Sequence, residues 1–254
     1  MILYRFFSAE YGLRTLETGL MRVGRFQDFN DPFEFMPQNT ELIGNESLIC
    51  EFHRQSFIAA SGSRYGIICF SEERTVTKPL MWSHYADSHR GLAIGFNVNP
   101  LTNSTVMFEG SSVDGKRGLT AGPVIYDGYL DLNCPGEDRK NLRVRAEEFD
   151  VLAKSEINAA TDLSPALGKT SPLMFHKGED WRYECEWRAG VALRCVKFSG
   201  GHHFIDISRF SVARIVLGMR CPFAPLFLQE VAIRFGAEIL VATPSKTKFE
   251  LELD

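Results

Sequence analysis

The chain has 254 residues, of which 44% are hydrophobic and 24% are charged, and its formal net charge at pH 7 is -4. This composition is typical of globular proteins and excludes collagen-like, disordered and coiled-coil chains. The weakly acidic balance also argues against a non-specific nucleic-acid binder, which carries a large excess of basic residues. A local basic patch stays compatible with this balance.

The sequence predicts a cytoplasmic protein without a membrane partner. No stretch approaches the ~18 consecutive apolar residues of a membrane span, and residues 1–7 lack the basic start of a secretory signal. The six cysteines are scattered and form no C-x-x-C pair, which favours reduced thiols. The 20 phenylalanines predict a core rich in aromatic side chains.

The first elements in chain order are predicted to be a strand, a helix and a strand. Residues 3–7 form a short apolar run, and Ser8 can cap a helix that ends at Gly19. Residues 20–26 resume extended character. Asn30-Asp31-Pro32 then predicts a turn, because Pro32 disfavours a helical conformation at the residue before it.

The middle of the chain alternates between short elements and loops. The pattern predicts a helix over 45–60, a strand over 65–70, a helix over 79–87 that begins with proline, and a strand over 92–96. Residues 99–122 are rich in Gly, Ser, Thr and Asn, so they are predicted to be mostly loop.

The last part of the chain is rich in predicted strands. Its predicted elements are a strand at 124–129, a long helix at 138–160, strands at 181–196, 203–207 and 212–218, a helix at 222–235, and strands at 238–242 and 248–253. Strands and helices mix without strict β-α-β alternation. The sequence therefore predicts one α+β domain over residues 1–254, with mixed, mainly antiparallel sheets and surrounding helices.

The segment from Trp181 to Arg188 alternates strictly between apolar or aromatic and charged residues. A period of two predicts a strand with Glu184 and Glu186 side by side on one face, about 7 Å apart at their Cα atoms. Two carboxylates on a rigid element are a candidate catalytic pair. The alternative is a solvated sheet face with glutamate–arginine pairs across strands.

The segment from Pro79 to Gly91 is dense in polar aromatic residues. His84 could act as an acid, a base or a hydrogen-bond donor near neutral pH, and Trp82 and Tyr85 could stack on a flat ring. The alternative is that Trp82 and Tyr85 belong to the core. The histidines and cysteines lack the close spacing of zinc sites, so no metal is expected.

Four stretches together resemble domain-of-unknown-function family 2971, a mainly bacterial group. They are the stretches at 29–34 (FNDPFE), 69–72 (CFSE), 80–89 (LMWSHYADSH) and 181–188 (WRYECEWR). The resemblance carries no activity. It implies that the four stretches belong to one site or one structural unit.

The order of residues along the chain also resembles that of ADP-ribosyltransferases. The matching residues are Arg5 on the first strand, Ser71 with Tyr85 in the middle, and Glu184-x-Glu186 late in the chain. The order is likewise similar to that of DNA-targeting transferase toxins. The S-T-S triplet of these enzymes is missing.

This second resemblance implies a split-sheet core and an enzyme that cleaves the nicotinamide–ribose bond of NAD, in a toxin or defence role. Glu186 would stabilise the positively charged sugar, Glu184 would activate a protein or nucleic-acid acceptor, and Arg5 would neutralise the pyrophosphate. Ser71 and Tyr85 would bound the nicotinamide pocket. Trp82 or His84 would pack beneath it.

Two other functions stay open from the sequence. The first is a non-enzymatic ligand-binding or regulatory module that uses the same pocket. The second is a hydrolase or nuclease that acts through His84, Glu184 and Glu186. No G-x-S-x-G motif supports a serine hydrolase, and no G-x-G-x-x-G or P-loop motif supports a common nucleotide fold.

Overall fold

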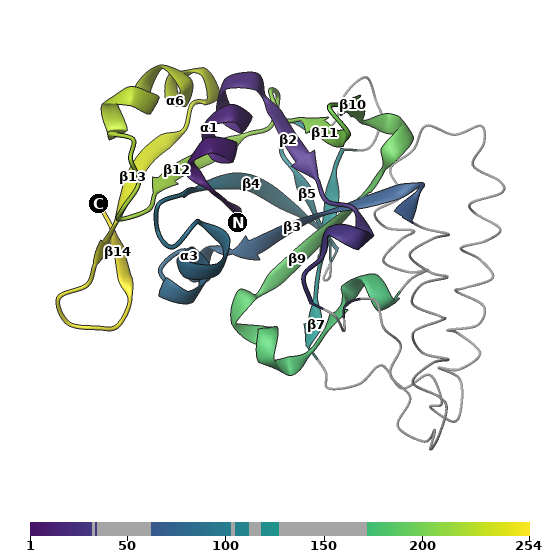
Figure 1. The fold of residues 1–254 in the computed structure, drawn as a ribbon, viewed down its shortest axis with the longest axis horizontal. Coiled ribbons are helices and arrows are strands. Elements are labelled where there is room, and N and C mark those ends of the chain that lie inside the picture. Colours follow the sequence, from purple (N-terminus) through teal and green to yellow (C-terminus); the bar gives the residue numbers. More distant parts are fainter. Residues whose placement is uncertain (32–33, 35–61, 103–104, 112–117, 127–171) are drawn as a thin grey trace.

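The computed structural model describes residues 1–31, 34, 62–102, 105–111, 118–126 and 172–254 (Figure 1). The helices predicted at 45–60 and 138–160 lie outside these residues, as do Cys50 and Cys134. The four described cysteines are free thiols rather than disulfides.

The described strands form one large sheet that partly closes on itself. Neighbouring strands follow the order β1 (Ile2–Phe7), β3 (Tyr65–Glu72), β9 (Glu186–Ala192), β6 (Thr120–Pro123), β5 (Thr105–Phe108), β4 (Leu92–Thr102), β12 (Val212–Leu217), β13 (Glu238–Pro244) and β14 (Leu251–Leu253). Since β1 also pairs with β4 along its whole length, the first six strands close into a barrel-like ring.

Two small sheets complete the described strands. One follows the order β10 (Lys197–Ser199), β11 (His202–Asp206) and β2 (Leu20–Val23), and the other pairs β7 (Ile125–Tyr126) with β8 (His176–Lys177). Within the described part of the chain, only the β12–β13 and β7–β8 pairs are parallel. The predicted α+β class with mainly antiparallel sheets is therefore confirmed.

Three α-helices pack around the sheet in the described residues. Helix α1 (Ala9–Thr18) begins at Ser8, whose side chain accepts from the amide of Tyr11, and ends at Gly19 with a φ of 69°. The other two are α3 (Pro79–Tyr85), with proline in its first turn, and α6 (Gln229–Phe235). The predicted positions of all three helices are confirmed, although α3 and α6 are shorter than predicted.

Short 3-10 helices connect the larger elements. They are η1 (Phe26–Asp28), η2 (Glu73–Thr75), η4 (Pro172–Phe175), η5 (Glu179–Glu184), η6 (Leu193–Cys195) and η7 (Pro225–Leu228).

The main core fills the ring and the space beneath α1 and α6, and it is rich in aromatic side chains as predicted. Phe70, Phe96, Phe108 and Phe210 contact one another with ring centroids 4.6 to 6.1 Å apart. A second cluster, which includes Trp82 of α3, Tyr4 of β1 and Ala93 of β4, packs on the other side of β1 and β4. Strand β1, which lines the site, is therefore packed on both faces.

The prediction of a loop over 99–122 is wrong in part. Strand β4 continues to Thr102, and β5 and β6 fall within the predicted loop. Val106 and Phe108 alternate with half-buried residues on β5 and enter the core, so burial outweighs the turn-forming composition around them.

The sheet has a split that positions the site. Strand β1 pairs with β3 only at Leu3 and Tyr4, whereas it stays paired with β4 through Phe7. Beyond Tyr4, β1 leaves β3, whose Ile67 pairs instead with Gly24. A gap therefore opens between the second half of β1 and the first half of β3.

Candidate functional site

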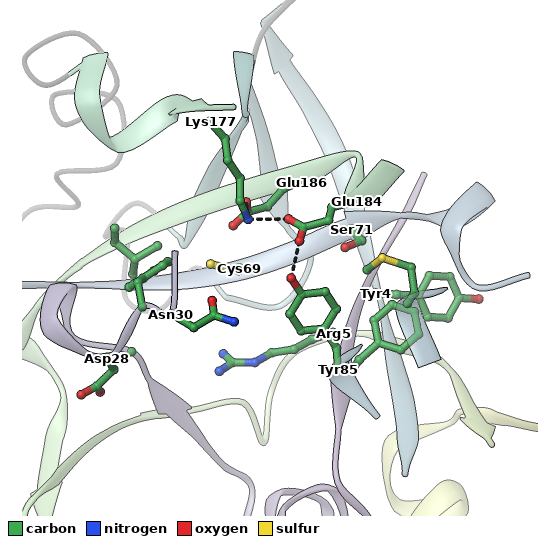
Figure 2. A pocket seen from close by; sticks show the side chains of 15 residues that line it. Tyr4, Arg5, Asp28, Asn30, Cys69, Ser71, Tyr85, Lys177, Glu184 and Glu186 are labelled. Atoms are coloured by element: carbon green, nitrogen blue, oxygen red, sulfur yellow. Dashed lines mark hydrogen bonds and ion pairs between the residues drawn. The ribbon is translucent and has the colours of Figure 1, made fainter. Parts of the chain in front are cut away.

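A cavity of about 260 Å³ lies at this split. The β1 side contributes Arg5 and Phe6, and the β3 side contributes Ile67, Cys69 and Ser71. Other lining residues come from α3, β8, η5, β9 and the segment at 24–30. The cavity thus draws on distant parts of the chain. Figure 2 shows that Lys177, Glu184, Glu186 and Tyr85 point toward one another.

Two carboxylates on one side of the cavity share a lysine. The Nζ atom of Lys177 lies 2.6 Å from Oε2 of Glu184 and 3.2 Å from Oε2 of Glu186. All three side chains are almost fully buried, with exposed fractions of 8%, 4% and 5%. The ring of Trp181 lies over the Lys177 ammonium at 4.7 Å and shields the ion pairs further.

Arg188 fixes the carboxylate of Glu186. Its Nε and Nη2 atoms donate to Oε1 and Oε2 of Glu186 at 2.9 and 3.0 Å, a two-point contact that fixes the plane of the carboxylate. Arg188 also donates to the carbonyl of Met174 at 2.7 Å and to the carboxylate of Glu34. Because Arg188 is fully buried, these contacts make Glu186 a rigid part of the site.

The two glutamates have opposite protonation tendencies. Burial alone would raise the pKa of Glu186, but the charges of Arg188 and Lys177 outweigh burial and hold this pKa at about 2. Burial raises the pKa of Glu184 and the charge of Glu186 raises it further, against the opposing charge of Lys177. Glu186 is thus a permanent anion, and Glu184 is the carboxylate better suited to exchanging a proton.

Tyr85 and Tyr126 connect neighbouring elements to this pair. The hydroxyl of Tyr85, on α3, donates to Oε1 of Glu184, and the hydroxyl of Tyr126 accepts from the backbone amide of Glu186 at 2.7 Å. Burial, together with the charge of Glu184, raises the pKa of Tyr85, so its phenol stays protonated.

Arg5 lies on the side of the cavity away from the glutamates (Figure 2). Its Nη1 atom is buried and has no hydrogen-bond partner among the described residues. Burial lowers the pKa of Arg5 to about 10, which leaves the side chain charged at neutral pH. A buried cation without a carboxylate beside it is costly, and a bound anion would offset that cost.

The structure brings five of the seven sequence-predicted site residues to this one cavity: Arg5, Ser71, Tyr85, Glu184 and Glu186. The other two do not line it. Trp82 is fully buried in the cluster on the other side of β1 and donates from Nε1 to the carbonyl of Val76 at 2.7 Å. His84 is exposed, with its ring 6.2 Å from those of Tyr85 and Tyr183. The structure therefore does not bring Trp82 and His84 together with the other five residues.

The predicted continuous strand over 181–188 is also wrong. Residues 179–184 form η5, Cys185 has a left-handed conformation with φ 43° and ψ 52°, and the strand begins at Glu186. Near the start of η5, Arg182 and Glu179 form an ion pair three residues apart, with Nη2 and Oε2 at 2.6 Å. Such a pair suits a helical turn and would be lost in a strand.

The turn at Cys185 reverses the expected burial. Glu184, Glu186 and Arg188, the expected solvent face, are buried, whereas Trp181, Tyr183 and Trp187 are only half-buried. The solvated-face alternative is therefore wrong for these three residues. Their charges are satisfied by one another and by Lys177, which no motif in the sequence marked.

The four stretches that carry the family resemblance meet at this site. Glu34 of the first contacts Arg188 of the fourth, Ser71 of the second lines the cavity, and Tyr85 of the third bonds to Glu184 of the fourth. The turn predicted at Asn30-Asp31-Pro32 agrees with the hydrogen bond from the amide of Glu34 to the carbonyl of Asp31 at 3.1 Å. Glu34 in addition supports the charged cluster through Arg188, while residues 32–33 lie outside the described part.

Comparison with known proteins identifies a family without an assigned activity. Residues 81–189 match the family model described as "Protein of unknown function (DUF2971)", which confirms the family resemblance seen in the sequence. No curated protein and no solved structure matches the chain.

Two features of the described residues concern membranes and metals. None of the helices there is long and apolar enough to cross a membrane. No group of three or more His, Cys, Asp and Glu side chains in the same part of the chain could hold a metal ion.

Proposed function

We propose that this chain, which matches the DUF2971 family over residues 81–189, binds NAD at the split between β1 and β3 and cleaves its nicotinamide–ribose bond. The observation that carries the proposal is the pair Glu184 and Glu186 in a cavity that also contains Arg5, whose Nη1 atom has no hydrogen-bond partner in the described part of the chain. The ADP-ribose group would pass to an acceptor, which is water, a protein or a nucleic acid.

The charge balance of the cluster suits this reaction. Three carboxylates (Glu34, Glu184 and Glu186) face two cations (Lys177 and Arg188), so the cluster has excess negative charge when all are ionised. When the C1′–N bond breaks, the electron pair leaves with nicotinamide and positive charge develops on the ribose. A fixed anion beside the ribose lowers the barrier to that step.

The two carboxylates would divide the work. Glu186, held ionised and rigid, would stabilise the sugar cation. Glu184, with its raised pKa, would take the proton of the acceptor as the acceptor oxygen or nitrogen forms its bond to C1′. The phenol of Tyr85 would orient Glu184 for that transfer.

The first test measures nicotinamide released from NAD by the wild-type chain and by Glu186→Gln. We expect a fall of about 10²–10³-fold in turnover with NAD binding largely retained. Glu184→Gln should slow transfer to an acceptor. Glu179→Gln is the matched control, because Glu179 lies in the same segment but is exposed and pairs with Arg182 outside the cavity.

A non-enzymatic ligand-binding module is the second candidate. The observation that favours it is that Arg188 occupies both oxygens of Glu186, as in a structural ion pair. Wild-type chain that binds NAD and releases no nicotinamide would support this module. Chain that neither binds nor cleaves NAD would refute the proposed activity.

A further inference from the structure

A second and larger cavity, of about 670 Å³, adjoins the first one. It lies between β1 with α1 on one side and β2 with β11 on the other, and it shares Arg5, Phe6 and Tyr85 with the smaller cavity. The two cavities therefore meet at Arg5.

The lining of the larger cavity is basic although the chain as a whole is acidic. Arg5, Arg14 and Arg22 line it, and none of its described lining residues is an aspartate or a glutamate. Arg22 pairs at 3.2 Å with Asp28, which lies outside this lining. The lining is thus a local basic patch on a chain whose net charge is negative.

Two of the three guanidinium groups, those of Arg5 and Arg14, have no acidic partner among the described residues. Nη1 of Arg5 is buried without a hydrogen-bond partner in the described part of the chain, and the charge of Arg22 contributes to lowering the pKa of Arg5. Arg14 is exposed on α1 and has no ion-pair partner among the described residues. Arginines in this state are ready donors to the oxygens of an anion.

The rest of the lining suits a nucleoside. Tyr11, with 54% of its surface exposed, and Phe204 offer aromatic faces, and Ser8 and Thr15 add hydroxyl groups. Aromatic rings stack on nucleobases, and hydroxyls bond to sugars and phosphates.

Size points in the same direction. Pockets that enclose a drug-sized ligand have volumes of roughly 300–1,000 Å³. The smaller cavity falls short of that range, whereas the larger cavity lies within it. A dinucleotide whose ribose bond is broken in the smaller cavity would have to extend past Arg5.

We propose that the larger cavity binds a nucleoside diphosphate group, with its phosphates at Arg5, Arg14 and Arg22 and its base against Tyr11 and Phe204. The assignment of this group to the dinucleotide that is cleaved rests on the proposed function. The binding of a diphosphate does not, because it needs no bond cleavage.

Calorimetric titration with ADP tests the proposal, since ADP has no nicotinamide bond. We expect ADP to bind more weakly as salt is added, and Arg14→Gln and Arg22→Gln each to weaken it by about tenfold. Both variants should fold, because Arg14 is exposed and the Arg22–Asp28 pair is largely at the surface. Arg209→Gln, an exposed arginine outside the cavity, is the control and should bind like wild type.

Two probes separate the parts of the ligand. Pyrophosphate alone should show the same sensitivity to Arg14→Gln, and adenosine alone should not. ADP binding that is undetectable, or equal in all variants, would overturn the proposal even if nicotinamide release succeeds.

Competition with NAD identifies the source of the diphosphate. Displacement of NAD by ADP would support a dinucleotide that spans both cavities. Simultaneous binding of NAD and ADP would show that the larger cavity does not hold the diphosphate of NAD. It would mean instead that this cavity binds the nucleotide of a second molecule.

Discussion

Arg5 stands out at the scale of single residues. Its Nη1 atom is buried, and no carboxylate pairs with its guanidinium group among the described residues. Groups selected for binding often reduce the stability of the empty protein. Replacement by an apolar side chain of similar length should therefore stabilise the fold and remove the ligand site.

For Arg5→Met we expect the free energy of unfolding to rise by about 1 kcal/mol, and the affinity for ADP to fall by tenfold or more. Urea unfolding and calorimetry measure the two effects. The control is Arg214→Met, because Arg214 pairs with Glu73 at 2.7 Å and with Glu238 at 3.2 Å. This variant removes both ion pairs, so its free energy of unfolding should fall. A loss of stability in Arg5→Met would show that the buried charge has a partner.

Glu186 gives a prediction about pH at the same scale. Its folded pKa of about 2 lies below the ordinary value of 4.5, so its ionisation stabilises the folded state above about pH 4.5. That contribution is lost as the pH falls from 4.5 towards 2. The raised pKa values of Glu34 and Glu184 act in the opposite sense. Because the charge of Glu186 helps to raise both, Glu186→Gln lowers these pKa values, which makes the difference between wild type and variant smaller than Glu186 alone would give.

The stability difference between wild type and Glu186→Gln should therefore be largest near pH 6 and shrink by roughly 2–3 kcal/mol towards pH 2–3. Urea unfolding at several pH values measures this difference. A difference that does not change with pH would mean that Glu186 has an ordinary pKa in the folded protein.

At the scale of elements, Cys185 determines where η5 ends and β9 begins, because its backbone conformation terminates the 3-10 helix. Its positive φ is costly for any residue with a Cβ atom and most costly for a β-branched one. A strand would have the opposite preference.

Cys185→Gly should therefore stabilise the fold by about 0.5–1 kcal/mol, and Cys185→Val should destabilise it by about 2 kcal/mol. Thermal unfolding of the two variants provides the comparison. If valine were as stable as glycine, the continuous strand expected from the alternating sequence would be right after all.

The same segment shows why sequence reasoning located the residues but not their geometry. Alternation between Trp181 and Arg188 predicts a strand from nearest neighbours alone. The fold instead buries the charged residues, because Lys177 and Glu34 supply partners from other elements. Those partners follow from tertiary contacts, which no local pattern encodes.

Elements with their own local signals were predictable. Ser8 and Gly19 mark the ends of α1, and Pro79 marks the start of α3. Strand β5 was missed because its four residues lie within a stretch rich in turn-forming residues. The larger cavity could not be predicted, because Arg14 and Arg22 line a common cavity only once the fold places α1 and β2 beside β11.

At the scale of the whole molecule, the site depends on a sheet that is closed on one side and split on the other. β1 completes the ring through β4, yet leaves β3 after two residues, so one short strand forms a wall of both cavities. Residues far apart in the sequence therefore meet around Arg5.

This closure has a consequence for a newly made chain. β1 is synthesised long before η5 and β9, which carry the carboxylates opposite Arg5. A chain truncated before η5 has the arginine without either carboxylate. Such a fragment therefore lacks the pairing of charges on which the proposed chemistry depends.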